Sequence, residues 1–217
     1  MTQPQPYQAW GVSATPDIFG PILGPRDVRR ALQATLANWA DTYIAEMAQR
    51  TDTPMVAVGE WDAVWEDRAL PADLTPAVWA TCWSTDPKMT PRRNGDGTWR
   101  AFYIAQANIA LYGEDWAAAA DLMGLYLAAL RSCVLQNRDL GGFATDTMWL
   151  GEAVHEMERQ TRRTVEVGVA QFRVTVDDVV DDNLGPRSPG TPPGTGGNPT
   201  VDQVNVTLDE YPPGDLP

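Results

Sequence analysis

The sequence predicts an α+β fold: a mostly antiparallel or mixed β-sheet with two main helices packed on it, a long projecting β-hairpin and an extended C-terminal arm. Two segments repeat apolar residues every three or four positions, as amphipathic helices do. Four others are rich in aromatic and β-branched residues, and proline and glycine dominate after residue 182. These changes divide the 217 residues into an irregular leader (1–25), a domain (26–182) and a Pro/Gly-rich arm (183–217).

Both helices are predicted from stripes of apolar residues that would face a core. The stripe of the first helix, residues 26–50, consists of Val28, Leu32, Leu36, Trp39, Tyr43 and Met47. The stripe of the second helix, residues 116–137, consists of Trp116, Ala120, Met123, Leu127, Leu130 and Val134.

The projecting hairpin is predicted from two strands, residues 77–83 and 99–112, with a polar loop between them. The loop contains Asn-Gly-Asp-Gly at 94–97, which supplies turn chemistry. The second strand would span about 45 Å, which is long for a globular domain. Residues 52–76, which precede the hairpin, read as a loop with room for one short strand.

Two further strands are predicted at residues 148–157 and 162–180. In the last strand the apolar residues change face, from Val165, Val167 and Val169 to Phe172 and Val174. Side chains of a strand alternate between its two faces, so this change requires either a bulge or burial on both faces. We favour a bulge near residues 168–171.

One clean alternation lies inside the arm, near residues 203–209. Val204, Val206 and Leu208 fall on one side of it, and polar residues fall on the other. This pattern predicts a strand that lacks a neighbouring hairpin partner. The hypothesis is that it extends a sheet edge in its own subunit or in a neighbour, and the alternative is an unstructured tail.

The net charge of the chain argues against a protein that binds nucleic acid tightly. Sixteen Lys and Arg stand against 29 Asp and Glu, which gives a net charge of −13. Binding to phosphates depends on clustered basic residues, whereas an acidic surface suits a protein that lies near DNA without sticking to it. The first ten residues do not form a signal peptide, and residues 116–135 are too mixed for a membrane span, so we expect a soluble protein made in a cytoplasm.

The sequence predicts no catalytic residue, no cofactor and no metal site. His155 is the sole histidine, and neither a phosphate-binding glycine loop nor a nucleophile elbow occurs. Cys82 and Cys133 are interpreted as buried thiols, although the spacing leaves a disulfide open.

Two rival readings depend on particular residue types. Four carboxylates at the end of the last strand could serve a metal-dependent hydrolase, but a solvated strand end is favoured: Asp177, Asp178, Asp181 and Asp182. The nine tryptophans could bind sugars on an exposed face, but positions such as Trp39 and Trp116 favour core or subunit-interface aromatics.

Short motifs also recur in a characteristic order along residues 26–210. They are Trp-Ala-Asp-Thr-Tyr at 39–43, Leu-Thr-Pro-Ala-Val at 74–78, Asp-Gly-Thr-Trp at 96–99, Leu-Ala-Ala-Leu-Arg at 127–131, Leu-Gly-Gly at 140–142, Trp-Leu-Gly-Glu at 149–152, Arg-Arg-Thr at 162–164, Phe-Arg-Val-Thr-Val-Asp at 172–177, Gly-Pro at 185–186 and Val-Asn-Val at 204–206. This order resembles the tail terminator proteins of long-tailed (siphovirus-type) phages that infect actinobacteria. Trp79 and Trp83 depart from the smaller residues expected of that family.

The resemblance implies a virion protein that caps the finished tail tube as a ring, hexameric in that family, and meets the head's connector. Its partners would be other copies of itself, the tail tube protein and the connector or stopper protein, with double-stranded DNA passing through the lumen without specific binding. The family has no catalytic residues to carry over. The nearest alternative is another ring of the same machine, a head-completion protein or a tail tube subunit.

The hypothetical contacts fall on two segments. The loop at 85–98 would meet the tube or connector, and the arm would hold a neighbouring subunit. The residues assigned to these contacts are Lys88, Arg92, Arg93, Asn94 and Asp96 in the loop, and Val204, Val206 and Leu208 in the arm.

Overall fold

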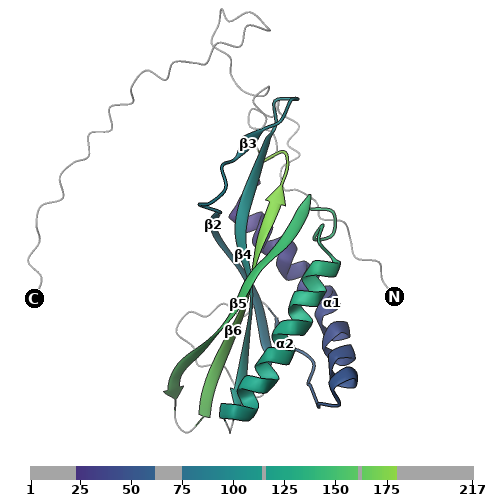
Figure 1. Cartoon of the computed structure of the whole chain (residues 1–217), viewed down its shortest axis with the longest axis vertical. Coiled ribbons are helices and arrows are strands. Elements are labelled where there is room, and N and C mark those ends of the chain that lie inside the picture. The colour runs from purple at the N-terminus through teal and green to yellow at the C-terminus, as the bar shows by residue number, and fades with distance from the viewer. Residues whose placement is uncertain (1–22, 62–74, 114–115, 161–162, 180–217) are drawn as a thin grey trace, which may run out of the picture. The chain divides into compact units, whose positions relative to one another are not determined.

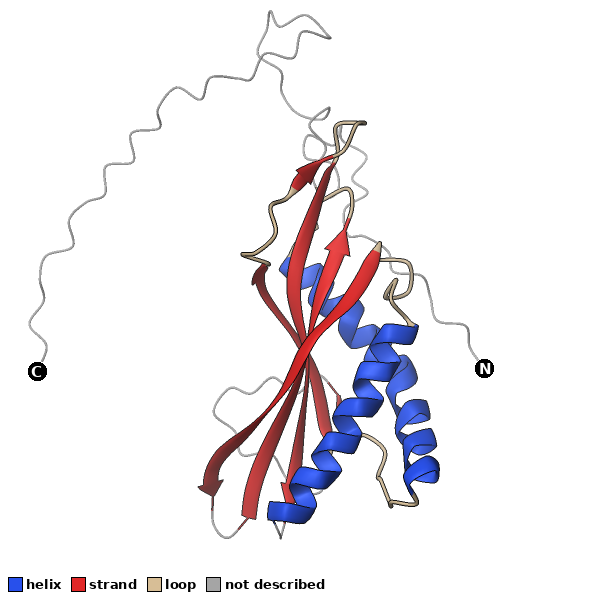
Figure 2. Cartoon of the chain, in the orientation of Figure 1, coloured by secondary structure: helices blue, strands red, loops and turns tan. Residues whose placement is uncertain are grey.

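The computed structural model describes residues 23–61, 75–113, 116–160 and 163–179, of which 112–113, 116–118, 156–160 and 163–165 are described by their backbone alone. They form two helices and six strands, and both helices pack on one face of a mixed sheet (Figures 1 and 2). The predicted α+β class is confirmed. The leader to residue 22, residues 62–74 and the arm from 180 lie outside the described residues.

Helix α1 (Pro25–Thr51) begins and ends close to the predicted positions. Pro25 suits the first turn because its ring fixes φ in the helical range and it has no N–H to satisfy. The Asp27 carboxylate accepts a hydrogen bond of 3.1 Å from the Gly24 N–H. Asp52 ends the helix in the left-handed conformation, with φ of 51°.

The buried stripe of α1 differs from the predicted one at Trp39, which is 43% exposed. The stripe runs through Val28 and Leu32 to Leu36, as predicted, and then continues in steps of four to Ala40 and Ile44. An α-helix has about 3.6 residues per turn, so a row of residues spaced by four drifts around the helix. This drift leaves Trp39 outside the buried row. The prediction of a core tryptophan at position 39 is therefore wrong.

Helix α2 (Trp116–Gln136) also matches its predicted range. Met123, Leu127, Leu130 and Val134 are buried as predicted. Tyr126 is buried as well, and its hydroxyl accepts a hydrogen bond from the Val56 N–H and donates one to the Val56 carbonyl, both at 2.8 Å. This pair of bonds fixes the segment after α1 against α2.

The predicted hairpin is formed by β2 (Ala77–Thr85) and β4 (Trp99–Gly113), which pair in antiparallel register. A two-residue strand, β3 (Arg92–Arg93), pairs with the start of β4. The short strand expected before the hairpin is β1 (Glu60–Trp61), which runs parallel to β2. The end of the hairpin that carries β3 extends past the ends of both helices (Figure 1).

The sheet is completed by β5 (Asp146–Gln160) and β6 (Arg163–Val176), and its strand order is β1-β2-β4-β6-β5. The predicted bulge in the last strand is wrong, because β6 pairs with β4 without a break from Val176 to Thr164. The bulge lies instead in β5, where the register shifts between Trp149 and Gly151.

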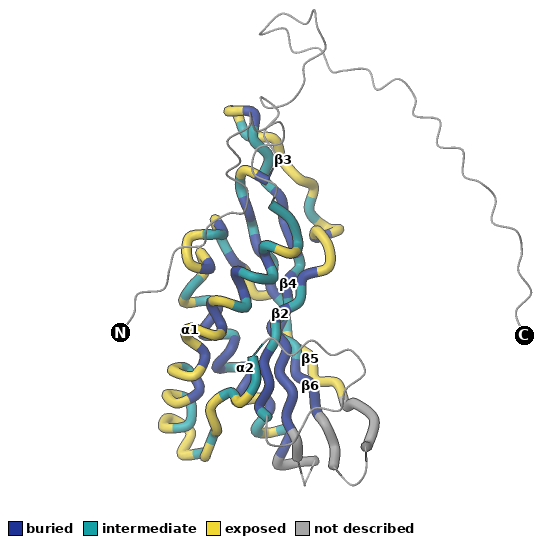
Figure 3. Tube along the Cα trace, turned by 180° about the vertical axis from the view of Figure 1, so that it is seen from behind, coloured by how far each residue is buried: buried dark blue, intermediate teal, exposed yellow. Residues whose placement is uncertain are grey.

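The change of apolar face in β6 reflects burial on both sides of the strand. Phe172 and Val174 belong to the main core beneath the helices. Val167 and Val169 instead belong to a second small cluster with Ala77, Ala110 and Trp79. Buried residues therefore run along the whole middle of the sheet (Figure 3).

Candidate interaction surface

The loop residues assigned to an interface all lie on the connection between β2 and β4. Lys88, Arg92, Arg93 and Asp96 are exposed, and Asn94 is half-buried. All five residues therefore lie on this one connection. Val204, Val206 and Leu208 lie outside the described residues.

Asn94 and Asp96 act within the hairpin tip, where they build the turn. The Asn94 N–H donates to the Thr98 carbonyl at 2.7 Å, and the Asn94 side-chain amide donates to the Thr98 hydroxyl at 2.9 Å. One carboxylate oxygen of Asp96 accepts from the Thr98 N–H at 3.0 Å and from its hydroxyl at 2.7 Å. Gly97 has a φ of 92°, which favours glycine.

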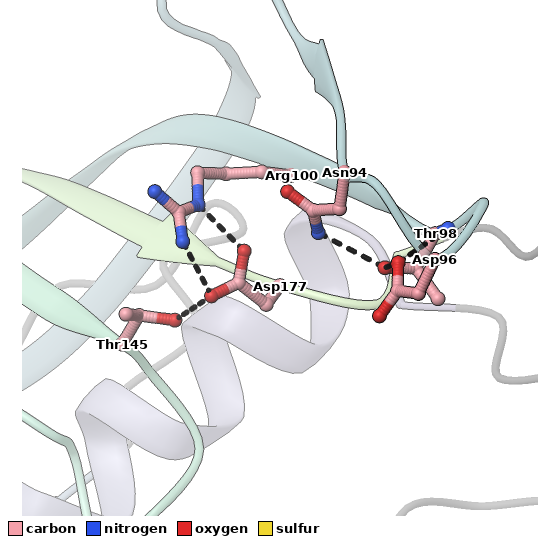
Figure 4. A network of polar contacts seen from close by, with 6 residues as sticks. All are labelled: Asn94, Asp96, Thr98, Arg100, Thr145 and Asp177. Carbon is pink, nitrogen blue, oxygen red and sulfur yellow. Dashed lines mark hydrogen bonds and ion pairs between the residues drawn. The ribbon is translucent and has the colours of Figure 1, made fainter.

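These bonds make the tip a rigid turn (Figure 4). The hydrogen bond from the Thr98 N–H is the largest cause that lowers the pKa of Asp96. Asp96 and Asn94 therefore hold the shape of the turn, while the basic side chains at 88, 92 and 93 form the exposed positive charge of the connection. We call these three the basic tip: Lys88, Arg92 and Arg93.

An arginine–carboxylate pair fastens the tip to the end of β6 (Figure 4). Arg100 Nε lies 2.6 Å from Asp177 Oδ1, and Arg100 Nη2 lies 3.0 Å from Asp177 Oδ2. The Thr145 hydroxyl donates to Asp177 Oδ2 at 2.7 Å, and the Val179 N–H donates to the Trp99 carbonyl at 3.0 Å. The guanidinium of Arg100 is the first cause that lowers the pKa of Asp177.

A second pair holds the base of the same connection. Asp86 is 3% exposed, and its Oδ2 lies 2.5 Å from Arg173 Nε on β6. Its other oxygen accepts a hydrogen bond of 2.9 Å from the Lys88 N–H, which is the largest cause that lowers the pKa of Asp86. The loop that carries the basic tip is therefore anchored to β6 at both ends.

The acidic cluster considered for a metal site is divided by these contacts. Asp177 is bonded to Arg100 and Thr145, Asp178 is exposed with φ of 58°, and Asp181 and Asp182 lie outside the described residues. Within the described ranges, no three His, Cys, Asp or Glu side chains are placed to hold a metal ion. None of the described helices is long and apolar enough to cross a membrane.

The cysteines and the histidine considered in the sequence lie where the sequence predicted them. Cys82 and Cys133 are buried free thiols, as predicted, and burial raises their pKa values to about 11 and about 12. His155 is exposed on β5, in the extended conformation expected for it.

Sequence reasoning missed a group of exposed apolar side chains on β5. Met148, Trp149, Leu150 and Val154 are four of the seven large hydrophobic residues that are exposed among those described. Arg131 on α2 covers part of this group, because its guanidinium lies 4.8 Å from the Trp149 ring and its Nη1 lies 2.9 Å from Glu152. The run Met-Trp-Leu at 148–150 was the available signal, but a core strand contains such runs too.

Comparison with solved structures shows distant likeness, of which one example follows. No family model matches the chain, and no curated protein matches it. A chain from the solved structure titled "Virion of native gene transfer agent (GTA) particle" aligns with a TM-score of 0.42 and 16% identity. The alignment covers 68% of this chain and 96% of that one. Similarity at this level does not establish a shared function.

Proposed function

We propose that this chain is a structural protein of a phage virion, which closes the end of the tail tube as a ring of six copies and meets the head's connector. The order of the short motifs from residue 39 to residue 206 supports this assignment. The role requires no catalytic site. It requires surfaces that recognise other subunits.

The basic tip is the observation that carries the proposal. A chain with net charge −13 presents Lys88, Arg92 and Arg93 together on one loop. That loop is held by Asp86–Arg173 at its base and by Arg100–Asp177 at its tip. A preorganised loop loses little conformational entropy when it docks on a partner.

The overall charge fits the passage of DNA. A strongly acidic protein repels phosphates, so a genome could slide through the lumen of such a ring without binding. We assign the basic tip to a protein contact, the tail tube or the connector, because three basic side chains are few for a phosphate-binding surface.

The test is to add the purified chain to isolated tail tubes and to view the tube ends by electron microscopy. The proposal predicts single closed rings at tube ends, and open stacked polymers would instead indicate a tube subunit. The double variant Lys88→Glu, Arg92→Glu should lose this binding. Its control is Arg26→Glu, Arg50→Glu, which changes the net charge equally at exposed positions of α1.

Equal binding by the two double variants would refute the role of the basic tip. Rings that bind head connectors and ignore tubes would identify the chain as a head-completion protein.

A further inference from the structure

We infer that the outer edge of β5 is the docking site for residues 203–208 of a neighbouring copy, which would add a strand to the sheet. This inference rests on the proposed ring and assigns a receptor surface for its arm. Three features support it: the position of β5 at the edge of the described sheet, the exposure of Val154 and the length of chain that precedes residue 203.

The two edges of the sheet differ in how much of their backbone is occupied. At the β2 edge, β1 pairs with Ala77 and Val78, and the Gln33 side chain accepts a hydrogen bond of 2.6 Å from the Ala80 N–H. At the opposite edge, β5 pairs with β6 and with no other strand of the described part of the chain. Every second residue of an edge strand directs its N–H and C=O away from its neighbour, so β5 offers a row of backbone partners.

The bulge at Leu150 determines which part of β5 is usable. Beyond it, Gly151 to Met157 pair with Gln171 to Val165 without a shift. This regular stretch is long enough for the six alternating residues 203–208. A strand added here would bind through backbone hydrogen bonds, and every second side chain would give the specificity.

Val154 indicates the orientation of the added strand. It is 50% exposed and pairs with Gly168, where an added Cβ would point at Met123 and Leu127 of α2. Val154 therefore faces the helix side of the sheet. Val204, Val206 and Leu208 would lie on the same side as Val154, and Gln203, Asn205 and Thr207 would lie beside Ala153 and His155 on the other.

The length of the intervening chain allows residues 203–208 to reach a neighbouring copy. Asp146 pairs with Thr175, so β5 begins beside the end of β6, and the outer edge of β5 is about 10 Å away, two strand spacings. Residues 180–202 are rich in proline and glycine, and such a chain can reach roughly 70 Å. The regular stretch of β5 begins five residues, about 17 Å, farther along, so this chain is long enough to reach the β5 of an adjoining copy in the proposed ring as well as its own.

Cysteine cross-linking in the full chain tests the inference, since Cys82 and Cys133 are buried. Ala153→Cys is combined in turn with Gln203→Cys, Asn205→Cys and Thr207→Cys and oxidised at rising protein concentration. We expect one pairing to give a ladder of covalent oligomers that strengthens with concentration. Ala57→Cys, an exposed alanine outside the sheet, replaces Ala153→Cys in the matched control and should give none.

A second variant tests the surface without cysteines. Val154→Lys should weaken ring formation on tail tubes at least tenfold, because a charge in place of Val154 opposes strand addition at this edge. Val56→Lys makes the same change at a residue that is 66% exposed and outside the sheet, and should have no effect.

The outcomes separate this inference from the proposed ring. A disulfide formed within one chain would refute docking on a neighbour. Rings that form on tubes in the absence of any ladder would refute the β5 site and leave the ring intact. A concentration-dependent ladder from a chain that ignores tail tubes would support the β5 site and refute the ring.

Discussion

Arg100, at the start of β4, and Asp177, just after β6, are joined by two parallel hydrogen bonds of 2.6 and 3.0 Å. The two residues are 77 positions apart in the sequence, and their pairing connects the base of the hairpin tip to the end of β6. Fork-shaped pairing of guanidinium and carboxylate fixes direction as well as distance. A partner that meets the basic tip therefore meets a surface of defined orientation.

Removal of the charge at Asp177 should loosen this pair. We expect Asp177→Asn to lower the free energy of unfolding by about 1 kcal/mol, because both side chains are partly exposed and the pair is only partly shielded from water. Urea unfolding should show a lower midpoint with an unchanged slope. Asp178→Asn is the control, since Asp178 is exposed and asparagine tolerates its positive φ; an equal loss there would contradict the assigned role.

The stability of the fold should fall in acid. The pKa values of Asp86, Asp96 and Asp177 are all lowered in the folded chain, by hydrogen bonds from Lys88, Thr98 and Arg100 respectively. The unfolded chain binds protons first as pH falls, so these carboxylates stabilise the fold above the unfolded pKa and lose that effect below about pH 4.

Urea midpoints measured between pH 3 and pH 7 should show a plateau that ends in this range. In Asp177→Asn the urea midpoint should fall less steeply as the pH is lowered, because one of the three carboxylates is gone. An equally steep fall of the midpoint in the variant and the parent chain would contradict the contribution of Asp177.

Gly168 of β6 lies close to α2. A Cβ at this position would lie 2.5 Å from Met123 Sδ and 3.1 Å from Leu127. We expect Gly168→Ala to destabilise the fold by about 1–2 kcal/mol through overpacking, which a thermal melt would detect. Gly151→Ala on β5 is the matched strand control, because no atom lies within 4 Å of its added Cβ.

The two thiols should be inert in the folded protein. Burial raises the pKa of Cys82 to about 11 and that of Cys133 to about 12, so almost no thiolate exists at pH 8. Alkylation by iodoacetamide at pH 8 should label neither residue in buffer and both residues in denaturant, as read by mass spectrometry. Rapid labelling of the native chain would show that the core opens around them.

The arm should matter for assembly and not for folding. A chain ending at residue 182 retains the whole sheet and both helices, so its urea midpoint should equal that of the full chain. Its assembly on tail tubes should be weaker because the segment proposed to hold a neighbour is gone. Assembly as strong as that of the full chain would refute the role of the arm.

The sequence predicted the elements well because their signals are local. The periods of α1 and α2, and the turn at residues 94–98, depend on residues close in the chain. The exposure of Trp39 depends on how α1 packs on the sheet, and the burial of Val167 depends on Ala77, Ala110 and Trp79 of neighbouring strands. No local pattern encodes either contact.

The candidate surface shows the same division. Exposed loop residues such as Lys88 and Arg92 were predictable from polarity and turn chemistry. The pairs that anchor them, Arg100 with Asp177 and Arg173 with Asp86, join residues 77 and 87 positions apart and became visible only in the fold. The edge position of β5 likewise follows from the order of strands in the sheet and not from its own residues.

The mass of the protein in solution, measured by light scattering with and without tail tube subunits, tests the central claim most directly. The account predicts a closed species of six times the 23.8 kDa chain, either free or formed only when tube ends are present. A chain that remains a monomer and ignores tubes would contradict it, as would polymers that grow without limit.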